Sequence, residues 1–323
     1  MVTRARPESS IDRAWVRSSL TGPVTAVHPA FTRDGDLDEA GIRAHIEHNL
    51  DAGTHTILLT YGDSLHSILT DREVGDVLKI VVSQTRKRAM VVAADRQWWT
   101  GEEIRFADFA REEGADLLMV LPPFWGGGNS EESLVRHYAV VAEHIPVMLV
   151  TALFYANQAL GLKVIRRLRD EVPGVVAIKD DVVGDFARRV TAMVAEQWPM
   201  MSGGLKVNHL DVHPYGAVGY MSSFMHWYPP IAHAYWRAIE AGDLARAAEI
   251  CRDYDHPFMD IANELPGGFD AVYHGNRELF GITGRWRRLP YHSLTDAEMD
   301  RLRAWWGSLP DLDGHRPAAG IVR

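Results

Sequence analysis

Short apolar segments alternate with longer amphipathic segments through most of this chain. The apolar segments are rich in Val, Ile, Leu, Met and Ala, and runs of this kind are typical of strands that are buried on both faces. Eight such strands are predicted, at Val24–Val27, Thr56–Thr60, Met90–Ala94, Leu117–Leu121, Val147–Ala152, Val175–Lys179, Met200–Gly203 and Gly219–Ser222.

Between these strands, apolar residues recur at helical spacing. The predicted helices are Asp38–Ala52, Asp71–Gln84, Glu102–Glu113, Glu131–Glu143 and Lys163–Glu171. Two helix starts have the spacing of a capping box, Thr70 to Glu73 and Thr100 to Glu103. Eight strand–helix units in succession predict an α/β fold with a closed parallel sheet, the (β/α)8 TIM barrel.

More helices are predicted after the eighth strand, at Ile231–Ala241, Leu244–Glu264, Ala271–Phe280 and Asp296–Trp306. The first of them closes the barrel, and the others form a C-terminal helical extension. The expected divisions are an N-terminal extension at 1–21, the barrel at 22–240, C-terminal helices packed on the barrel at 241–310 and a flexible tail at 311–323.

The composition is that of a large soluble globular protein, with 323 residues of which 46% are hydrophobic and 24% charged. Acids and bases are interspersed at a net charge of −9, which argues against a basic face for nucleic acid. No apolar run reaches the roughly 18 residues that span a membrane, and the N-terminal residues lack the apolar core of a secretory signal. The single cysteine, Cys251, excludes an internal disulfide and a cysteine-based zinc site, so a cytoplasmic location is expected.

Lys179 ends the sixth predicted strand and is one of only five lysines in the chain. Burial at such a position disfavours the ammonium form, lowers the lysine pKa and makes the amine a nucleophile for carbonyl carbons. In barrels of this kind the chemistry lies at the carboxyl ends of the strands. We therefore predict a catalytic role for Lys179, and the alternative is a lysine that only reaches solvent from a strand end.

A series of short motifs follows the same order along the chain. They are His28–Phe31 with Asp34–Asp38, Leu69–Glu73, Glu113–Asp116, Pro123–Trp125, Ile178–Asp180, Ser202-Gly203, Gly216–Ser222 and Arg288–Pro290. In this order they resemble the TPF…DG-xxD, LTxxE, LGAD, PYY, IKE/IKD, SG, GADGVIS and RLP segments of the dihydrodipicolinate synthase / N-acetylneuraminate lyase family of class I aldolases. The resemblance covers roughly Gly22 to Trp306.

The resemblance implies that Lys179 forms a Schiff base with the ketone of a 2-oxo acid such as pyruvate. The iminium withdraws electrons, so the adjacent carbon becomes an enamine at which carbon–carbon bonds form or break or water is lost. The resemblance also implies a homodimer or homotetramer and no metal or organic cofactor. The chain is thus expected to be a lyase with a small-molecule substrate, a 2-oxo acid or related ketone, and no nucleic-acid or membrane partner.

Two segments depart from the family pattern. The family has a proton-shuttling tyrosine at the end of the fifth strand, and Val150 stands in its place here. The GTTGE loop, which holds the substrate carboxylate in the family, corresponds to Thr60–His66, where Asp63 adds a negative charge. Two alignments stay open, one that pairs Gly62-Asp63 with GE and one that pairs Tyr61–Leu65 with the whole motif.

We expect Lys179, Asp63 and Tyr61 to be catalytic. The expected substrate-binding residues are Thr60, Gly62, Ser64, Arg96, Trp125, Thr151, Gly203 and Met221. Arg96 could bind a carboxylate through its planar fork, and a phenol could come from Tyr61 or Tyr155. Candidates for the general base are Asp63, His66 and Asp180. Asp63 ranks above Asp180 and Asp181, because a carboxylate beside a lysine commonly forms a solvated ion pair.

Aromatic residues gather after several predicted strands, which would suit an aromatic aldehyde as a second substrate or an apolar lid. They are Trp98, Trp99, Phe124, Trp125, Phe154 and Trp227. Packing against the outer helices or another subunit is the alternative for these rings.

Three other reactive residues have simpler explanations. His209 and His213 have a metal-binding spacing, but without the glutamate of HExxH a polar helix face is preferred and no metal is predicted. Lys206 is the rival Schiff-base lysine. Two other functions stay open: a hydro-lyase or isomerase that uses Asp63, His66 and Tyr61 without a Schiff base, and a non-catalytic small-molecule-binding barrel.

Overall fold

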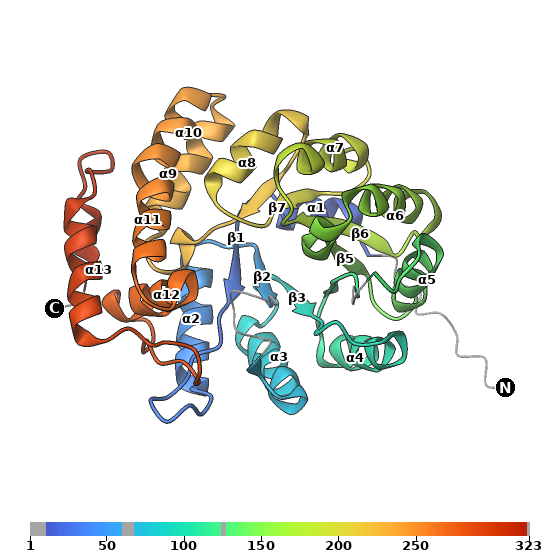
Figure 1. The fold of residues 1–323 in the computed structure, drawn as a ribbon, viewed down its shortest axis with the longest axis horizontal. Helices are drawn as coiled ribbons and strands as arrows, with labels where there is room; N and C mark the ends of the chain where they lie inside the picture. The colour runs from blue at the N-terminus through green and yellow to red at the C-terminus, as the bar shows by residue number, and fades with distance from the viewer. Residues whose placement is uncertain (1–10, 60–67, 124–126, 322–323) are drawn as a thin grey trace.

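The computed structural model describes residues 11–59, 68–123 and 127–321. Its parallel strands β1 to β8 pair in sequence order, and β1 also pairs with β8, so the sheet closes into a barrel (Figure 1). The predicted TIM barrel is confirmed. The strands are β1 Gly22–Val27, β2 Thr56–Leu59, β3 Met90–Ala94, β4 Leu117–Val120, β5 Val147–Val150, β6 Val175–Asp180, β7 Met200–Ser202 and β8 Gly219–Met221.

Helices that follow the strands surround the barrel (Figure 1). They are α2 Glu39–Asp51, α3 Asp71–Thr85, α4 Thr100–Glu113, α5 Glu131–Val141, α6 Gln158–Glu171, α7 Gly184–Val194, α8 Lys206–Val212 and α9 Pro229–Glu240. Short 3-10 turns lie at η2 Ala152–Ala156, η3 His213–Tyr215 and η4 Phe224–His226. Several predicted strands extended too far at their carboxyl ends. The predicted strand Val147–Ala152, for example, ends at Val150 because Thr151 has helical backbone angles.

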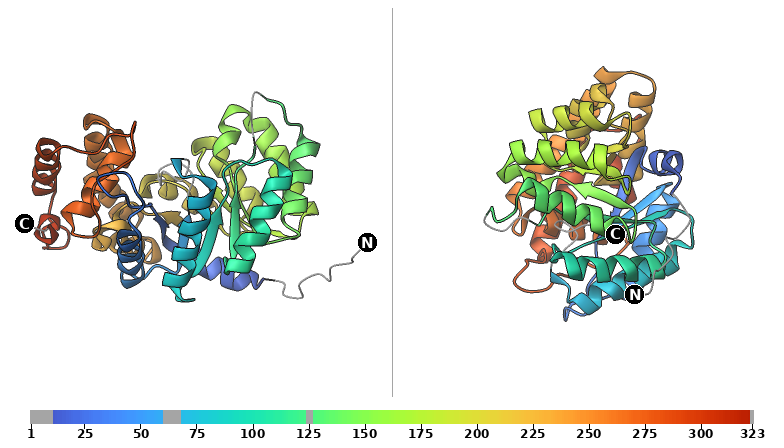
Figure 2. Two further views of the ribbon diagram at one scale, coloured as in Figure 1. Left: turned by 90° about the horizontal axis from the view of Figure 1, so that it is seen from below. Right: turned by 90° about the vertical axis from the view of Figure 1, so that its right-hand side faces the viewer.

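The two ends of the chain pack against the barrel in different places. Helix α1, Arg13–Ser19, lies across the amino-terminal side, where Arg13 and Arg17 donate to the carbonyl oxygens of Pro173 and Ala195 (Figure 2). The C-terminal helices lie on one side of the barrel, where α10 packs against α8 and α9 (Figure 1). They are α10 Leu244–Ile250, α11 His256–Glu264, α12 Gly268–Leu279 and α13 Asp296–Ser308, followed by η6 Pro317–Gly320. Within 311–321, Leu312 is buried.

The prediction of one continuous helix over Leu244–Glu264 is wrong. Helices α10 and α11 are separated by a π-helical turn, η5, at Cys251–Asp255. Pro257 has no backbone N–H, so it cannot donate the regular hydrogen bond to residue 253, and the helix widens just before it.

The two predicted capping boxes have different outcomes. At Thr70 the box is present, because the Thr70 hydroxyl accepts from the Glu73 N–H while the Glu73 carboxylate accepts from the Thr70 N–H. The box at Thr100 is wrong, since helix α4 already begins at Thr100 and Trp99 is its cap. The Thr100 hydroxyl instead lies 3.0 Å from His137 Nδ1, and Glu103 is buried.

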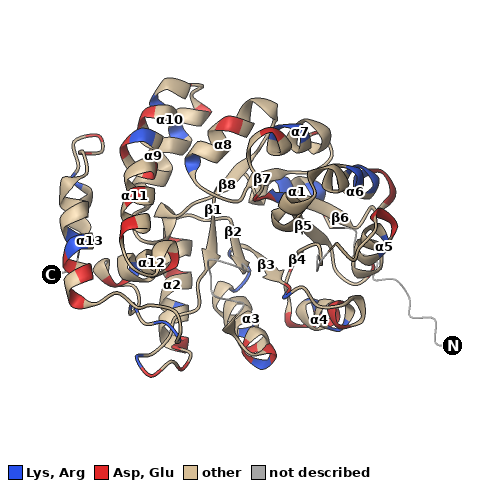
Figure 3. Cartoon of the chain, in the orientation of Figure 1, with Lys and Arg blue, Asp and Glu red and all other residues tan. Residues whose placement is uncertain are grey.

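Charged residues of both signs are interspersed over the outer helices, as Figure 3 shows. The buried hydrophobic residues form one core in the barrel and a second core between β8, α9 and the C-terminal helices. Among the described residues, no helix combines the length and the apolar character that a membrane span requires.

Candidate active site

Lys179 is the penultimate residue of β6, between Val150 of β5 and Met201 of β7 in the sheet register. Its side chain is only 6% exposed. The amine Nζ lies 2.6 Å from each carboxylate oxygen of Asp181. Because Asp181 follows the last residue of β6, this contact places the amine at the carboxyl end of the barrel, where the fold predicts the chemistry.

The Asp181 backbone is fixed by a buried hydrogen-bond network. The Thr151 hydroxyl donates to Asp180 Oδ1 at 2.6 Å and accepts from the Asp181 N–H at 2.9 Å. The other Asp180 oxygen accepts from the Val183 N–H at 3.0 Å. Burial raises the pKa of Asp180, while the hydrogen bonds from Thr151 and Val183 oppose that rise. Thr151 therefore joins the end of β5 to the turn after β6.

Two features of the backbone show how specifically this turn is shaped. Val183 has φ of 61°, a left-handed conformation that is unfavourable for a β-branched residue and that tends to occur at functional sites. Gly203, just after β7, leaves room for the Asp181 carboxylate, since a Cβ at Gly203 would lie 1.6 Å from Asp181 Oδ1. The carboxylate thus occupies space that any residue other than glycine would fill.

The arrangement combines a buried amine with a carboxylate in direct contact. Asp181 ranks behind Asp63 on the sequence alone, because a carboxylate beside a lysine is expected to form a solvated ion pair. Side-chain exposures of 6% for Lys179 and 25% for Asp181 show a pair that is largely withdrawn from solvent. Such a pair can hold a proton between its two members and pass it to a third group.

Part of the predicted site, Thr60, Tyr61, Gly62, Asp63, Ser64, His66 and Trp125, lies outside the described residues, as does Phe124. Arg96 follows β3 and donates to Asp71 Oδ1 at 2.9 Å. Met221 ends β8 and is buried. Tyr155 lies in η2 with 76% of its surface exposed.

The aromatic residues after the strands are distributed over different environments. Phe154 and Trp227 are buried in the hydrophobic cores, and the Trp98 ring packs on Phe106 with centroids 4.8 Å apart. Trp99 is 68% exposed, just before α4. Phe154 and Trp227 therefore pack inside the protein, and Trp99 is presented to solvent.

A sequence profile of the Dihydrodipicolinate synthetase family matches residues 19–305. The chain belongs to this family. A probable 5-dehydro-4-deoxyglucarate dehydratase 2 of Streptomyces avermitilis is 29% identical over 255 residues, which cover 78% of this chain and 74% of the relative. A probable 5-dehydro-4-deoxyglucarate dehydratase of Ralstonia nicotianae is 26% identical over 298 residues, with 91% and 93% coverage.

Solved structures of the family share the fold of this chain. Dihydrodipicolinate synthase from Oceanobacillus iheyensis superposes with a TM-score of 0.81 at 20% identity, over 92% of this chain and 100% of that one. A dihydrodipicolinate synthase from Bacillus anthracis superposes with a TM-score of 0.77 at 24% identity, over 90% and 99%. As a member of the dihydrodipicolinate synthetase family, the protein is an enzyme, a lyase, and not the non-catalytic barrel that the sequence left open.

Lys206, the other candidate for the Schiff-base lysine, is paired with a different carboxylate. It opens α8 and forms an ion pair with Asp255 of the π-turn, and both side chains are almost completely buried. Its ammonium also lies 4.2 Å from the centroid of the Phe224 ring. These contacts give Lys206 a structural role, in which it ties α8 to the C-terminal helices.

Replacing Asp255 by asparagine is expected to destabilise the protein by about 3–5 kcal/mol, because it leaves the Lys206 charge buried without a counter-charge. Urea unfolding of the purified variant measures the loss. Asp253→Asn is the matched control, since Asp253 lies in the same turn but pairs with the exposed Arg252 and should cost less than about 1 kcal/mol. Equal losses in the two variants would contradict the structural role.

A pair of buried acids that was not predicted from the sequence consists of Asp95, after β3, and Glu103, in the first turn of α4. Burial raises the pKa of both groups, and the charge of Asp95 raises that of Glu103 further. Asp95 Oδ2 accepts from the Leu121 N–H at 3.2 Å. The charge of Asp95 disfavours ionisation of Glu103, so a proton kept on one of the two carboxyl groups stabilises the pair. The pair could have been recognised from Glu103, because this residue stands at a position of α4 where the helical spacing predicts a buried apolar side chain.

This pair predicts a stability that falls with rising pH. The folded protein keeps protons that the unfolded chain releases above about pH 4. The pair therefore makes its full contribution to the free energy of unfolding below that pH, and this contribution is lost as the pH rises toward the raised pKa values. Each retained proton gives a slope of about 1.4 kcal/mol per pH unit. Glu103→Gln should therefore be more stable than the native protein at pH 8 and less pH-dependent. Glu102→Gln should not, because the Glu102 side chain is 40% exposed and pairs with Arg105. Urea unfolding between pH 5 and pH 8 checks this, and an unchanged slope in Glu103→Gln would refute it.

Three buried histidines, His28, His45 and His226, bring possible ligand atoms within 4.8 Å of one another. Arg277 Nη1 donates to His45 Nδ1 at 3.3 Å, so the proton of His45 is on Nε2, which lies 3.0 Å from His226 Nδ1. Burial and the charge of Arg277 lower the pKa of His45 well below its usual range, and burial lowers the pKa of Arg277 to about 9. The neutral His45 ring beside the Arg277 guanidinium disfavours a metal cation at this cluster.

His209, one of the two histidines at metal-binding spacing, is hydrogen-bonded within the protein. His209 Nδ1 lies 2.8 Å from the Tyr235 hydroxyl, which donates to the Lys206 carbonyl. Burial lowers the pKa of His209 to about 3. This histidine is thus a neutral member of a buried hydrogen-bond network, so the polar helix face predicted for this segment is wrong at His209, which is completely buried.

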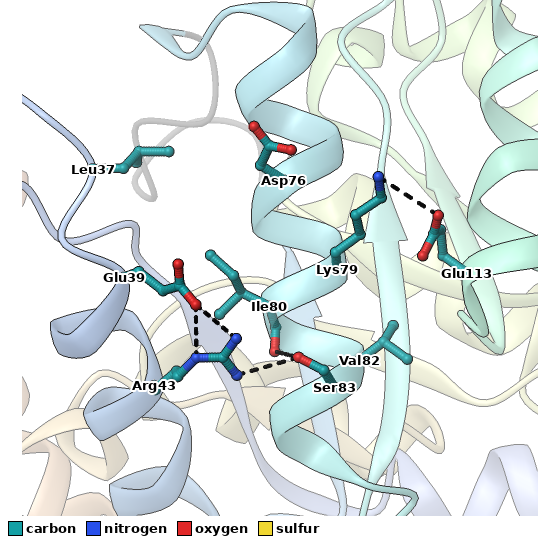
Figure 4. Close-up of a pocket in the computed structure, with 9 residues that line it drawn as sticks. All are labelled: Leu37, Glu39, Arg43, Asp76, Lys79, Ile80, Val82, Ser83 and Glu113. Carbon is teal, nitrogen blue, oxygen red and sulfur yellow. Dashed lines mark hydrogen bonds and ion pairs between the residues drawn. The ribbon is translucent and has the colours of Figure 1, made fainter.

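A surface groove lies between α2 and α3, and none of the residues that line it belongs to the candidate active site (Figure 4). Four of its five charged lining residues are paired with one another. Arg43 binds Glu39 at 2.8 Å, and Lys79 lies 3.8 Å from Glu113. These residues are on outer helices, so the groove contributes nothing to the candidate active site.

Proposed function

We propose that the protein is a Schiff-base lyase in which Lys179 condenses with the ketone of a 2-oxo acid or related ketone. The observation that carries this proposal is the buried Lys179 amine at the carboxyl end of β6, in direct contact with a carboxylate. Withdrawal of electrons by the iminium allows the adjacent carbon to lose a proton or a carbon substituent. The next carbon can then lose a hydroxyl as water.

The names of the relatives support dehydration as the reaction, and they suggest 5-dehydro-4-deoxyglucarate as the first substrate to test. In 5-dehydro-4-deoxyglucarate, the ketone carbon lies beside a terminal carboxylate, the next carbon is a methylene and the one after it carries a hydroxyl. An imine at the ketone would acidify the methylene and release that hydroxyl. A 4-hydroxy-2-oxo acid of this kind is therefore the substrate class we propose, with pyruvate-type aldol chemistry as a related reaction.

Two further features belong to the proposal. A homodimer or homotetramer is supported by the resemblance to the family. A cytoplasmic location is supported by the single cysteine, Cys251, which is buried and whose pKa is raised by burial to about 12.

The test is turnover of 5-dehydro-4-deoxyglucarate and a panel of 2-oxo acids, with products followed by mass spectrometry. The native enzyme should consume at least one of them, and Lys179→Ala should not. Activity that survives Lys179→Ala but is lost in Asp63→Asn would replace the proposal by the acid–base mechanism through Asp63, His66 and Tyr61.

A further inference from the structure

We propose that Asp181 is the catalytic acid and base of imine formation, and that it does the work for which the family uses a tyrosine. This inference rests on the proposed Schiff-base function of Lys179. Within the described part of the chain, both hydrogen bonds of the Lys179 amine go to the carboxylate of Asp181. A group that touches the reacting nitrogen can exchange protons with it directly.

The position of the missing tyrosine gives the first argument. Val150 pairs with Lys179 across the β5–β6 register and is buried, so the side chain nearest in the sheet cannot transfer a proton. The next residue, Thr151, uses its hydroxyl to donate to Asp180 and to accept from the Asp181 N–H. Thr151 is therefore a positioning residue, and the proton-transfer role passes to the carboxylate that it helps to hold.

The shape of the turn gives a second argument that is independent of the first. The Asp181 carboxylate occupies space that a side chain at Gly203 would fill, and the same turn holds Val183 in a left-handed conformation. The Gly203 N–H donates to the Asp180 carbonyl at 2.7 Å, which ties the end of β7 to this turn. A solvated surface ion pair has no need of such constraints, whereas proton transfer needs a fixed geometry.

Asp181 moves one proton at each of two stages of imine formation. Asp181 takes a proton from the Lys179 ammonium, and the free amine lone pair attacks the ketone carbon while the carboxylic acid returns that proton to the ketone oxygen. Asp181 then removes a proton from the new C–N nitrogen and delivers it to the hydroxyl, which leaves as water. The products are a protonated imine and one water molecule, and Asp181 ends as the carboxylate with which it began.

The two possible roles of Asp181 predict opposite changes in the rate of imine formation. If Asp181 only held the lysine in its charged form, then Asp181→Asn would free the amine and speed up its reaction with ketones. If Asp181 transfers the protons, then the same substitution slows imine formation by about 100-fold or more. The sign of the change separates the two roles.

The experiment mixes enzyme with pyruvate and with 5-dehydro-4-deoxyglucarate, quenches with borohydride at increasing times and measures the adduct by intact mass. Asp181→Asn is expected to form the adduct at least about 100-fold more slowly, and Asp181→Glu should recover part of the rate because it keeps a carboxylate. Asp185→Asn is the matched control, since Asp185 is an exposed acid in the first turn of α7. Circular dichroism and urea midpoints show that each variant is folded.

The outcomes separate this inference from the function on which it rests. An adduct in the native enzyme, with Asp181→Asn as fast or faster, overturns the role of Asp181 and leaves the Schiff base in place. If the native enzyme forms no adduct with either compound, both the Schiff base and the role of Asp181 are refuted. If Asp181→Asn does not fold, Asp181→Glu decides, because a rate unchanged by the displaced carboxylate would overturn the proposal.

Discussion

Gly203→Ala is expected to lower turnover by about 100-fold, although it adds only one methyl group. The new Cβ would lie 1.6 Å from Asp181 Oδ1 and 2.9 Å from the Asp180 carbonyl oxygen, so the carboxylate and the turn must both move. Displacement of a reacting group by about 1 Å can cost a factor of about 100 in rate. Gly203 has no positive φ, so the loss would come from the steric contact and not from backbone strain.

Its neighbour provides the control for this substitution. A Cβ at Gly204 would meet only the end of the Asn208 side chain, at 3.3 Å, which can rotate away. Gly204→Ala should therefore keep most of the turnover and the same unfolding midpoint. Steady-state rates of the two variants, measured on the same substrate, check the prediction. Gly203→Ala with nearly native activity would show that the position of the Asp181 carboxylate is unimportant.

Lys179→Arg is expected to have a still larger effect and to abolish measurable turnover, a loss of at least about 1,000-fold. The guanidinium keeps the positive charge and can keep the ion pair with Asp181, but it is never deprotonated in proteins and cannot attack a ketone. The variant thus removes the nucleophile while it leaves the charge balance of the site unchanged. Stopped assays of product formation measure the loss.

A second lysine offers the matched comparison. Lys163 is an exposed residue of α6, so Lys163→Arg should be indistinguishable from the native enzyme in rate and stability. Turnover of Lys179→Arg within tenfold of Lys163→Arg would mean that the reaction proceeds without an imine at residue 179.

Much of the fold could be predicted from the sequence because buried parallel strands carry a simple signal. Val175–Lys179 is almost uniformly apolar, and such a run between helical segments leaves few alternatives to a covered sheet. The same pattern identified Lys179 as the anomalous residue at a strand end. The structure adds Asp180 to this strand, which does not alter the position of the lysine.

The ion pair with Asp181 was harder to predict, because it depends on two elements that are separated in sequence. The space for the carboxylate is provided by Gly203 after β7, and the turn is fixed by Thr151 after β5. Periodicity describes one element at a time and carries no information on this contact. For the same reason, Glu103 was assigned to a capping box, whereas tertiary packing buries it against Asp95.

The most direct measurement for the whole account is a peptide map of the enzyme after borohydride reduction in the presence of a 2-oxo acid. We expect one stable adduct, with its mass increase confined to the peptide that contains Lys179 and absent from the peptide that contains Lys206. Substrate turnover without any adduct, or an adduct on another lysine, would contradict the assignment of Lys179 as the reacting amine.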